Sequence, residues 1–160
     1  MTIALKAMDE SAFSAYKKQA IPAYAKDNVS AGRWAESDAL ARSEKEFERL
    51  LPDGVNTKNN YLFNIIKNKQ EQNVGFVWVK IERHFNTKSA FIYDIEIAEA
   101  HRQQGYAKAA LSGIEKVVID LGATSLGLHV FNNNAAAMAL YNSIGYQMVS
   151  HNMNKVLRSE

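Results

Sequence analysis

The chain has 160 residues, 47% of them hydrophobic, which is enough for one domain with a sizeable core. A net charge of +2 from dispersed Lys and Arg residues argues against nucleic acid as a partner, and the absence of cysteine excludes disulfides, thiolate nucleophiles and cysteine metal sites. No apolar stretch approaches the length of a membrane span and the N-terminus lacks the pattern of a signal peptide, so we expect a cytoplasmic protein with no membrane partner.

Two helices are predicted in the first third of the chain. Asp9 or Ser11 can cap a helix that runs to about residue 19, and Pro22 should break or kink any continuation of it. Residues 35–51 carry apolar side chains among charges at helical spacing, and a Pro-Asp-Gly turn follows them.

An antiparallel meander of strands is predicted next. Residues 60–67 and 74–82 form two strands on either side of a polar turn, and residues 91–98 form a third. In the third strand apolar and polar side chains alternate, with Asp94 and Glu96 on one face.

The pattern changes from strand to helix directly after this third strand. From Ala107 the apolar residues recur at helical spacing, which predicts a helix over 107–121, and residues 125–131 predict a further short strand. The result is a β-α-β crossover with parallel strands. The loop 102–107 contains Gly105, and free backbone amides meet the positive end of the helix there. Such a junction favours an anion such as pyrophosphate.

The last third contains one more predicted helix. Asn134 is a good N-cap for a helix that carries Tyr141 and ends near Gly145. Residues 146–157 contain enough Val, Met and Tyr for one or two terminal strands.

Two segments of this chain resemble the signatures of one enzyme family. Arg102-Gln103-Gln104-Gly105-Tyr106-Ala107 is similar to the Q/R-x-x-G-x-G/A signature of the GCN5-related N-acetyltransferase (GNAT) family. Residues 134–146 resemble the family's second signature, with Asn134, Ala136, Tyr141 and Gly145 at its defining positions. The resemblance covers about residues 90–147. It implies an α/β fold, with a mixed, mostly antiparallel sheet flanked by helices around a central parallel β-α-β unit that binds cofactor, in a single domain over residues 1–160.

The resemblance implies acetyl-CoA as the acetyl donor and requires no metal. The four histidines show no metal-ligand spacing. The implied cofactor contacts are the backbone groups of Ile95, Glu96 and Ile97 for the pantetheine arm, the residues Arg102, Gln103, Gln104, Gly105, Tyr106, Ala107 and Lys108 for the pyrophosphate, and Asn134 and Tyr141 in the last helix.

Acetyl transfer from a thioester to an amine needs a general base, a polarised carbonyl and a proton for the departing thiolate. His129 is the preferred base, and Asp94 and Glu96 compete with it. An idle, hydrogen-bonded His129 and solvated or lysine-paired carboxylates are the plainer readings of the same residues. The resemblance implies that Tyr141 donates the proton and that the Ile97 amide polarises the carbonyl.

The sequence therefore predicts an N-acetyltransferase that transfers an acetyl group directly from acetyl-CoA to a primary amine. A covalent acetyl-enzyme is disfavoured because the chain has no cysteine and no legible Ser-His-Asp arrangement. The alternative is a non-catalytic acyl-CoA-binding module or sensor with the same fold. The sequence does not identify the acceptor, a small-molecule or peptide amine, and it leaves the oligomeric state open, a homodimer included.

Overall fold

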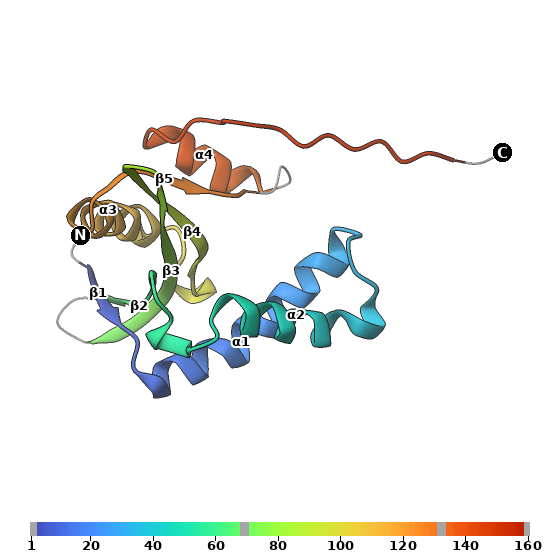
Figure 1. The fold of residues 1–160 in the computed structure, drawn as a ribbon, viewed down its shortest axis with the longest axis horizontal. Helices are drawn as coiled ribbons and strands as arrows, with labels where there is room; N and C mark the ends of the chain where they lie inside the picture. Colours follow the sequence, from blue (N-terminus) through green and yellow to red (C-terminus); the bar gives the residue numbers. More distant parts are fainter. Residues whose placement is uncertain (1–2, 68–70, 131–133, 159–160) are drawn as a thin grey trace. The chain divides into compact units, whose positions relative to one another are not determined.

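The computed structural model describes residues 3–67, 71–130 and 134–158. They fall into two compact units, Met1–His129 and Val130–Glu160. The first unit contains a mixed sheet with helices on both faces, and the second contains one helix and an extended tail (Figure 1).

The sheet follows the chain order β1-β2-β3-β4-β5 in the described residues. The first three pairings are antiparallel, whereas β4 and β5 are parallel, as the predicted crossover requires. The strands are β1 (Ile3–Ala7), β2 (Asn60–Lys67), β3 (Gln72–His84), β4 (Thr87–Ile97) and β5 (Ala123–Leu128). The parallel pair, β4 and β5, therefore lies at one edge of the described sheet, and β5 is the edge strand.

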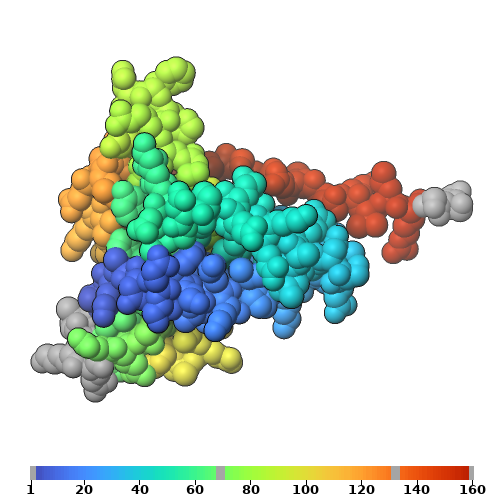
Figure 2. All heavy atoms as spheres, turned by 60° about the horizontal axis from the view of Figure 1, so that its bottom comes forward, coloured from blue at the N-terminus to red at the C-terminus, as the bar shows by residue number. Residues whose placement is uncertain are grey.

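Helices α1 (Glu10–Ser30) and α2 (Glu36–Leu50) lie side by side across one face of the first unit (Figure 2). Their buried aromatic side chains, among them Phe13 and Phe47, pack with Phe76 and Trp78 of β3. Helix α3 (Tyr106–Asp120) packs against β1 and β5, and its Gly113 lies close to the Leu5 side chain. The first unit therefore has three layers, namely α1 with α2, the sheet, and α3, because each helix buries an apolar face on the sheet.

Helix α1 is longer than the sequence predicts. Asp9 is its N-cap, with Oδ1 accepting a hydrogen bond from the Ala12 amide at 2.7 Å, but the helix continues through Pro22 to Ser30. A proline inside a helix removes one backbone hydrogen bond, so tertiary contacts must compensate for the loss. Contacts with α2 hold this part of α1, where the buried Ser43 hydroxyl donates to the Ile21 carbonyl at 2.7 Å.

The second unit bears out the predicted last helix but not the predicted terminal strands. Helix α4 (Ala135–Ser143) begins after Asn134, whose Oδ1 accepts from the Ala137 amide at 3.2 Å. Residues 146–158 form no strand, and Val149 is 96% exposed. Strand propensity alone does not order a segment that pairs with no neighbour. The predicted strand over 125–131 is observed as β5, which ends at Leu128; residues 129 and 130 are not in a strand, and residue 131 lies outside the described residues.

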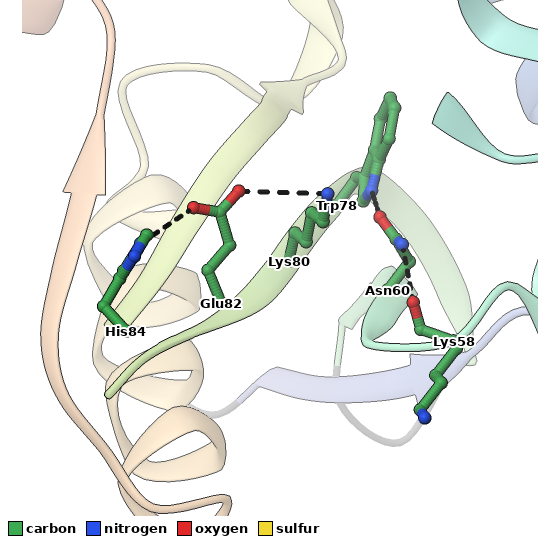
Figure 3. A network of polar contacts seen from close by, with 6 residues as sticks. All are labelled: Lys58, Asn60, Trp78, Lys80, Glu82 and His84. Atoms are coloured by element: carbon green, nitrogen blue, oxygen red, sulfur yellow. Dashed lines mark hydrogen bonds and ion pairs between the residues drawn. The ribbon is translucent and has the colours of Figure 1, made fainter. Parts of the chain in front are cut away.

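A network of polar contacts runs along β3, the strand whose Trp78 packs in the core with α1 and α2 (Figure 3). The Trp78 indole donates to Asn60 Oδ1 at 2.9 Å, and the Asn60 amide donates to the Lys58 carbonyl at 3.0 Å. Towards the β3-β4 hairpin, Glu82 pairs with Lys80 at 3.8 Å and with His84 at 3.4 Å. Trp78 is therefore held in one orientation, with its indole nitrogen satisfied inside the core.

Candidate active site

Strand β4 extends beyond its parallel neighbour. In the described residues the pairing of β4 with β5 ends at Ile92 and Leu128, although β4 continues to Ile97. Residues 94–97 therefore pair with β3 on one side and with no described strand on the other. Ligands of such sheets bind beyond the carboxyl ends of the parallel strands, which is the location of this segment.

The hydrogen-bond alternation of β3 and β4 determines which main-chain groups face the open side. The Ala98 amide donates to the Val74 carbonyl at 2.8 Å, and the register pairs Ile97 with Gly75 and Glu96 with Phe76. Because directly opposed antiparallel residues alternate between bonded and non-bonded pairs, Ile95 and Ile97 direct their main-chain groups away from β3, and Glu96 directs its own towards β3. Of the three residues predicted to bind the pantetheine arm, Ile95 and Ile97 thus have main-chain groups on the open side.

A β-bulge lies at the start of the open segment. Trp78 pairs with Asp94 and Val79 pairs with Ile92, so Tyr93 is an extra residue opposite the two. Bulges bend a strand and redirect its side chains, and they are frequent beside active sites. The bulge sets Asp94 opposite Trp78 on the face that carries α1 and α2.

The loop before α3 has the geometry of an anion site. Gln103 and Gly105 have left-handed backbone conformations, with φ of 60° and 85°, and Gly105 is the N-cap of α3 without a side-chain cap. In the described part of the chain, none of the amides of residues 103–108 donates to a protein acceptor. Successive amides in such a turn, at the positive end of a 15-residue helix, form a concave set of donors suited to a pyrophosphate.

Arg102 lies at this loop, but its side chain turns back towards β4. Its Nε donates to the Ile97 carbonyl at 2.8 Å, and its terminal nitrogen pairs with Glu96 Oε1 at 3.2 Å. These contacts tie the loop to the end of β4. They also assign the Glu96 carboxylate to an ion pair.

Asp94 is the most strongly perturbed carboxyl group of the site. Its Oδ2 accepts a hydrogen bond from the Tyr16 hydroxyl at 2.7 Å. Burial, opposed by that hydrogen bond, raises the pKa of Asp94 to about 6, and the neighbouring charges of Glu96 and Asp27 act in the same direction as burial. A carboxyl group with a pKa just below neutrality is suited to proton transfer.

The remaining predicted catalytic residues lie elsewhere in the chain. His129 is exposed and directly follows the last residue of β5. Tyr141 lies on α4, whose N-cap is Asn134, and both residues belong to the second unit, which is described separately from the first. Within that unit the Tyr141 ring contacts Tyr146 edge-on at 5.8 Å, and burial raises the pKa of Tyr141 above its ordinary value, so its hydroxyl is protonated at neutral pH.

Comparison with known proteins identifies the family. The profile of the acetyltransferase (GNAT) family matches residues 22–146. The chain belongs to this family. It is 36% identical over 157 residues to the uncharacterized N-acetyltransferases YdgE and YycN of Bacillus subtilis, covering 98% of this chain and 99% and 100% of theirs.

Solved structures of similar proteins agree with the fold. The crystal structure of YycN superposes with a TM-score of 0.92 at 35% identity, covering 99% of this chain and all of that one (100%). An acetyltransferase structure from Pyrococcus furiosus has a TM-score of 0.70 at 26% identity, covering 98% and 99%. The chain is therefore an N-acetyltransferase with the α/β fold of the GNAT family, which implies acetyl-CoA as its acetyl donor and an amine as its acceptor. No helix in the described ranges is long and apolar enough to cross a membrane.

Sequence reasoning about this GNAT protein missed one residue of the site. Tyr16 forms a buried apolar stripe with Phe13 and Ala20, at the spacing of a core-facing helix surface. A tyrosine in such a stripe carries a hydroxyl that needs a hydrogen-bond partner, so the sequence could have predicted that Tyr16 binds a polar group inside the core. Its partner, Asp94, is 78 residues away in the sequence, and only the fold brings the two together.

Proposed function

We propose that this GNAT protein transfers an acetyl group directly from acetyl-CoA to the primary amine of a small molecule or peptide. The observation that carries the proposal is the open edge of β4 beside the unbonded amides of residues 103–108. A pantetheine arm needs main-chain partners, which the Ile95 carbonyl and the Ile97 amide offer, and a pyrophosphate needs amide donors, which the loop offers. The family match spans both compact units, which supports treating residues 1–160 as one catalytic domain.

Each cofactor contact of the proposal follows from this arrangement. The amides of Gln103, Gln104, Gly105, Tyr106, Ala107 and Lys108 bind the pyrophosphate, and the Ile97 amide polarises the acetyl carbonyl. Arg102 acts chiefly by holding the loop against Glu96 and the Ile97 carbonyl, because its guanidinium is already bonded to both. Asn134 starts the helix that carries Tyr141, so it orders that segment.

Asp94 is the general base in this proposal. Its pKa of about 6 leaves it mostly ionised at neutral pH while keeping it a useful proton acceptor. Glu96 is the weaker candidate because Arg102 pairs with it, and His129 is the weaker candidate because it is exposed beyond the end of β5.

The proposed step balances in atoms and protons. The amine nitrogen forms a bond to the acetyl carbonyl carbon while the carbon–sulfur bond breaks. Asp94 takes a proton from the nitrogen, and the Tyr141 hydroxyl gives a proton to the departing thiolate. Both residues then recover their starting states by proton exchange with solvent.

A thiol-release assay tests the proposal. Purified protein is incubated with acetyl-CoA and a panel of small amines and peptides, and free CoA is measured. At least one amine should release thiol faster than protein-free mixtures. Asp94→Asn should then lower kcat by about 10²-fold to 10⁴-fold, whereas His129→Ala should leave most of the activity. Silence across the panel counts against the proposed function, and the reverse pattern of the two variants moves the base to His129.

A further inference from the structure

A partly buried hydrogen bond joins the first helix to the carboxyl-terminal part of β4. The Tyr16 hydroxyl donates to Asp94 Oδ2 at 2.7 Å, and Tyr16 itself is only 4% exposed. The bond closes a separation of 78 residues between α1 and β4. It is the one side-chain hydrogen bond to Asp94 seen across residues 3–67, 71–130 and 134–158, and the main-chain amide of Ile95 also interacts with this carboxylate.

The Tyr16 ring is fixed by aromatic neighbours from three elements. It meets Phe76 of β3 edge-on with ring centroids 4.7 Å apart, Phe47 of α2 at 6.4 Å and Phe13 of α1 at 6.5 Å. A ring packed on three sides has few orientations, so its hydroxyl presents one direction to Asp94. The donor is in place before any ligand arrives.

The charges around Asp94 explain why such a donor matters. Glu96 on the same strand and Asp27 on α1 both disfavour the ionised carboxylate, as burial does, whereas the Tyr16 hydroxyl and the Ile95 amide favour it. Burial first, and the charge of Asp94 second, raise the pKa of Tyr16 well above its ordinary value. Tyr16 therefore keeps its proton throughout the neutral range and acts only as a donor to Asp94.

We propose that Tyr16 is the positioning residue of the acetyl transfer, holding Asp94 by Oδ2 so that Oδ1 takes the proton of the amine. This inference rests on the proposed function, in which Asp94 is the base. Tyr16 does not touch the reacting atoms. It fixes the direction of the base and stabilises the ionised form that a base must have.

Tyr16→Phe is the matched change, because it removes the hydroxyl and keeps the ring in its aromatic surroundings. The side-chain carboxyl signals of ¹³C-labelled protein are titrated by NMR, and Asp94 is assigned by the signal missing in Asp94→Asn. We expect Tyr16→Phe to raise the Asp94 midpoint by about one pH unit, because a hydrogen bond to the charged form is lost. Tyr61→Phe is the control and should leave the midpoint unchanged, because Tyr61 alternates with Leu62 along β2 and so lies on the face of the sheet opposite the cluster that holds Tyr16. An unchanged midpoint in Tyr16→Phe overturns the inference.

Kinetics with the amine from the thiol-release panel provide the second test. The acidic limb of kcat/KM should move upward with the NMR midpoint, and the affinity for CoA should stay the same. In an Asp94→Asn background Tyr16→Phe should add almost no further loss, since its effect passes through Asp94. An Asp94→Asn variant with the parent's activity refutes the base assignment itself. If Asp94→Asn is inactive while Tyr16→Phe retains the parent's pH profile, the base stands and the positioning role fails.

Discussion

The ionised form of Asp94 lowers the stability of the folded chain, because the carboxylate is largely buried. Its pKa is raised to about 6 in the folded chain, whereas an unfolded aspartate has a pKa near its ordinary value of 3.8. A raised pKa means that the folded state binds the proton more tightly than the unfolded state does. The contribution of protonated Asp94 to the free energy of unfolding is therefore fully present below about pH 4 and is lost as the pH rises through about 6.

Replacing Asp94 by Asn should consequently stabilise the protein at neutral and alkaline pH. An amide of the same shape can still accept from Tyr16 through its oxygen, and it never ionises. At pH 8 we expect the free energy of unfolding to rise by roughly 2 kcal/mol, a value reduced for the partial exposure of the group, and the gain should shrink between about pH 6 and pH 4. Urea unfolding across this range measures it.

The exposed Asp53 offers a control for that experiment, because Asp53→Asn should change the stability little at any of these pH values. Equal unfolding free energies of Asp94→Asn and the parent at pH 8 would contradict the burial argument. A more stable but less active variant would show that the site retains a carboxylate at the expense of the fold.

Tyr141 makes the second prediction at the scale of a residue. Tyr141→Phe keeps the ring against Tyr146 and removes the proton donor. Turnover with acetyl-CoA should fall at least tenfold with little change in the affinity for CoA, which is the pattern of an interaction made mainly in the transition state. Comparing acyl donors tests the assignment further, because a thioester with a more acidic leaving thiol should lose less. Equal losses for both donors would exclude a role in protonating the thiolate.

At the scale of elements, the loop before α3 is open to a sharply controlled test. Gly105 precedes α3 with φ of 85°, and Gly122 follows it with φ of 94°. Valine is strained at either position, so Gly105→Val and Gly122→Val should both lower the melting temperature by comparable amounts. The Cβ atom at position 122 would meet only the flexible Lys88 side chain, at 3.4 Å.

Only the change at Gly105 should affect the cofactor. A side chain there obstructs the approach of a pyrophosphate to the loop amides, so titration calorimetry should find CoA binding weakened at least a hundredfold in Gly105→Val and unchanged in Gly122→Val. Loss of binding in both variants would indicate general strain in α3. Normal binding by a folded Gly105→Val protein would refute the placement of the phosphates.

The elements that sequence reasoning predicts well are those whose signal is local. Helix α2 and strand β2 match the predicted residues closely, since periodicity and flanking turns define both. Strand β1 was missed because its five residues carry little periodicity, and the predicted end of the first helix near residue 19 was wrong because α1 continues through Pro22, where its packing on α2 outweighs a local rule. The predicted terminal strands after residue 146 were also wrong, because a strand depends on a partner that the local sequence does not reveal.

The candidate site divides in the same way. The loop from Arg102 to Lys108 was recognisable from its glycine and its place between a strand and a helix. The β4 bulge, the bond from Tyr16 to Asp94 and the ion pair of Arg102 with Glu96 all depend on contacts between distant segments. The choice of Asp94 over His129 as the proposed base therefore needed the fold.

At the scale of the whole molecule, the two halves of the proposed cofactor site predict a specific linkage. One half is the set of loop amides at α3, and the other is the main chain of β4 over residues 94–97. A ligand that binds only the folded state stabilises it by RT ln(1 + [L]/Kd), about 2.7 kcal/mol at a hundredfold excess over Kd. For a chain of this length CoA should then raise the melting temperature by roughly 5–10 °C.

The ligand series distinguishes the two halves. ADP offers a pyrophosphate without the arm, and pantetheine offers the arm without the pyrophosphate, so each should stabilise the fold weakly. CoA carries both groups on one molecule, and its stabilisation should exceed the sum of the two fragments because the second contact forms at high effective concentration. NAD and ATP should behave like ADP. In Gly105→Val the ADP response should vanish while the pantetheine response persists. If CoA stabilised the protein no more than ADP does, the open edge of β4 would have no part in holding the cofactor.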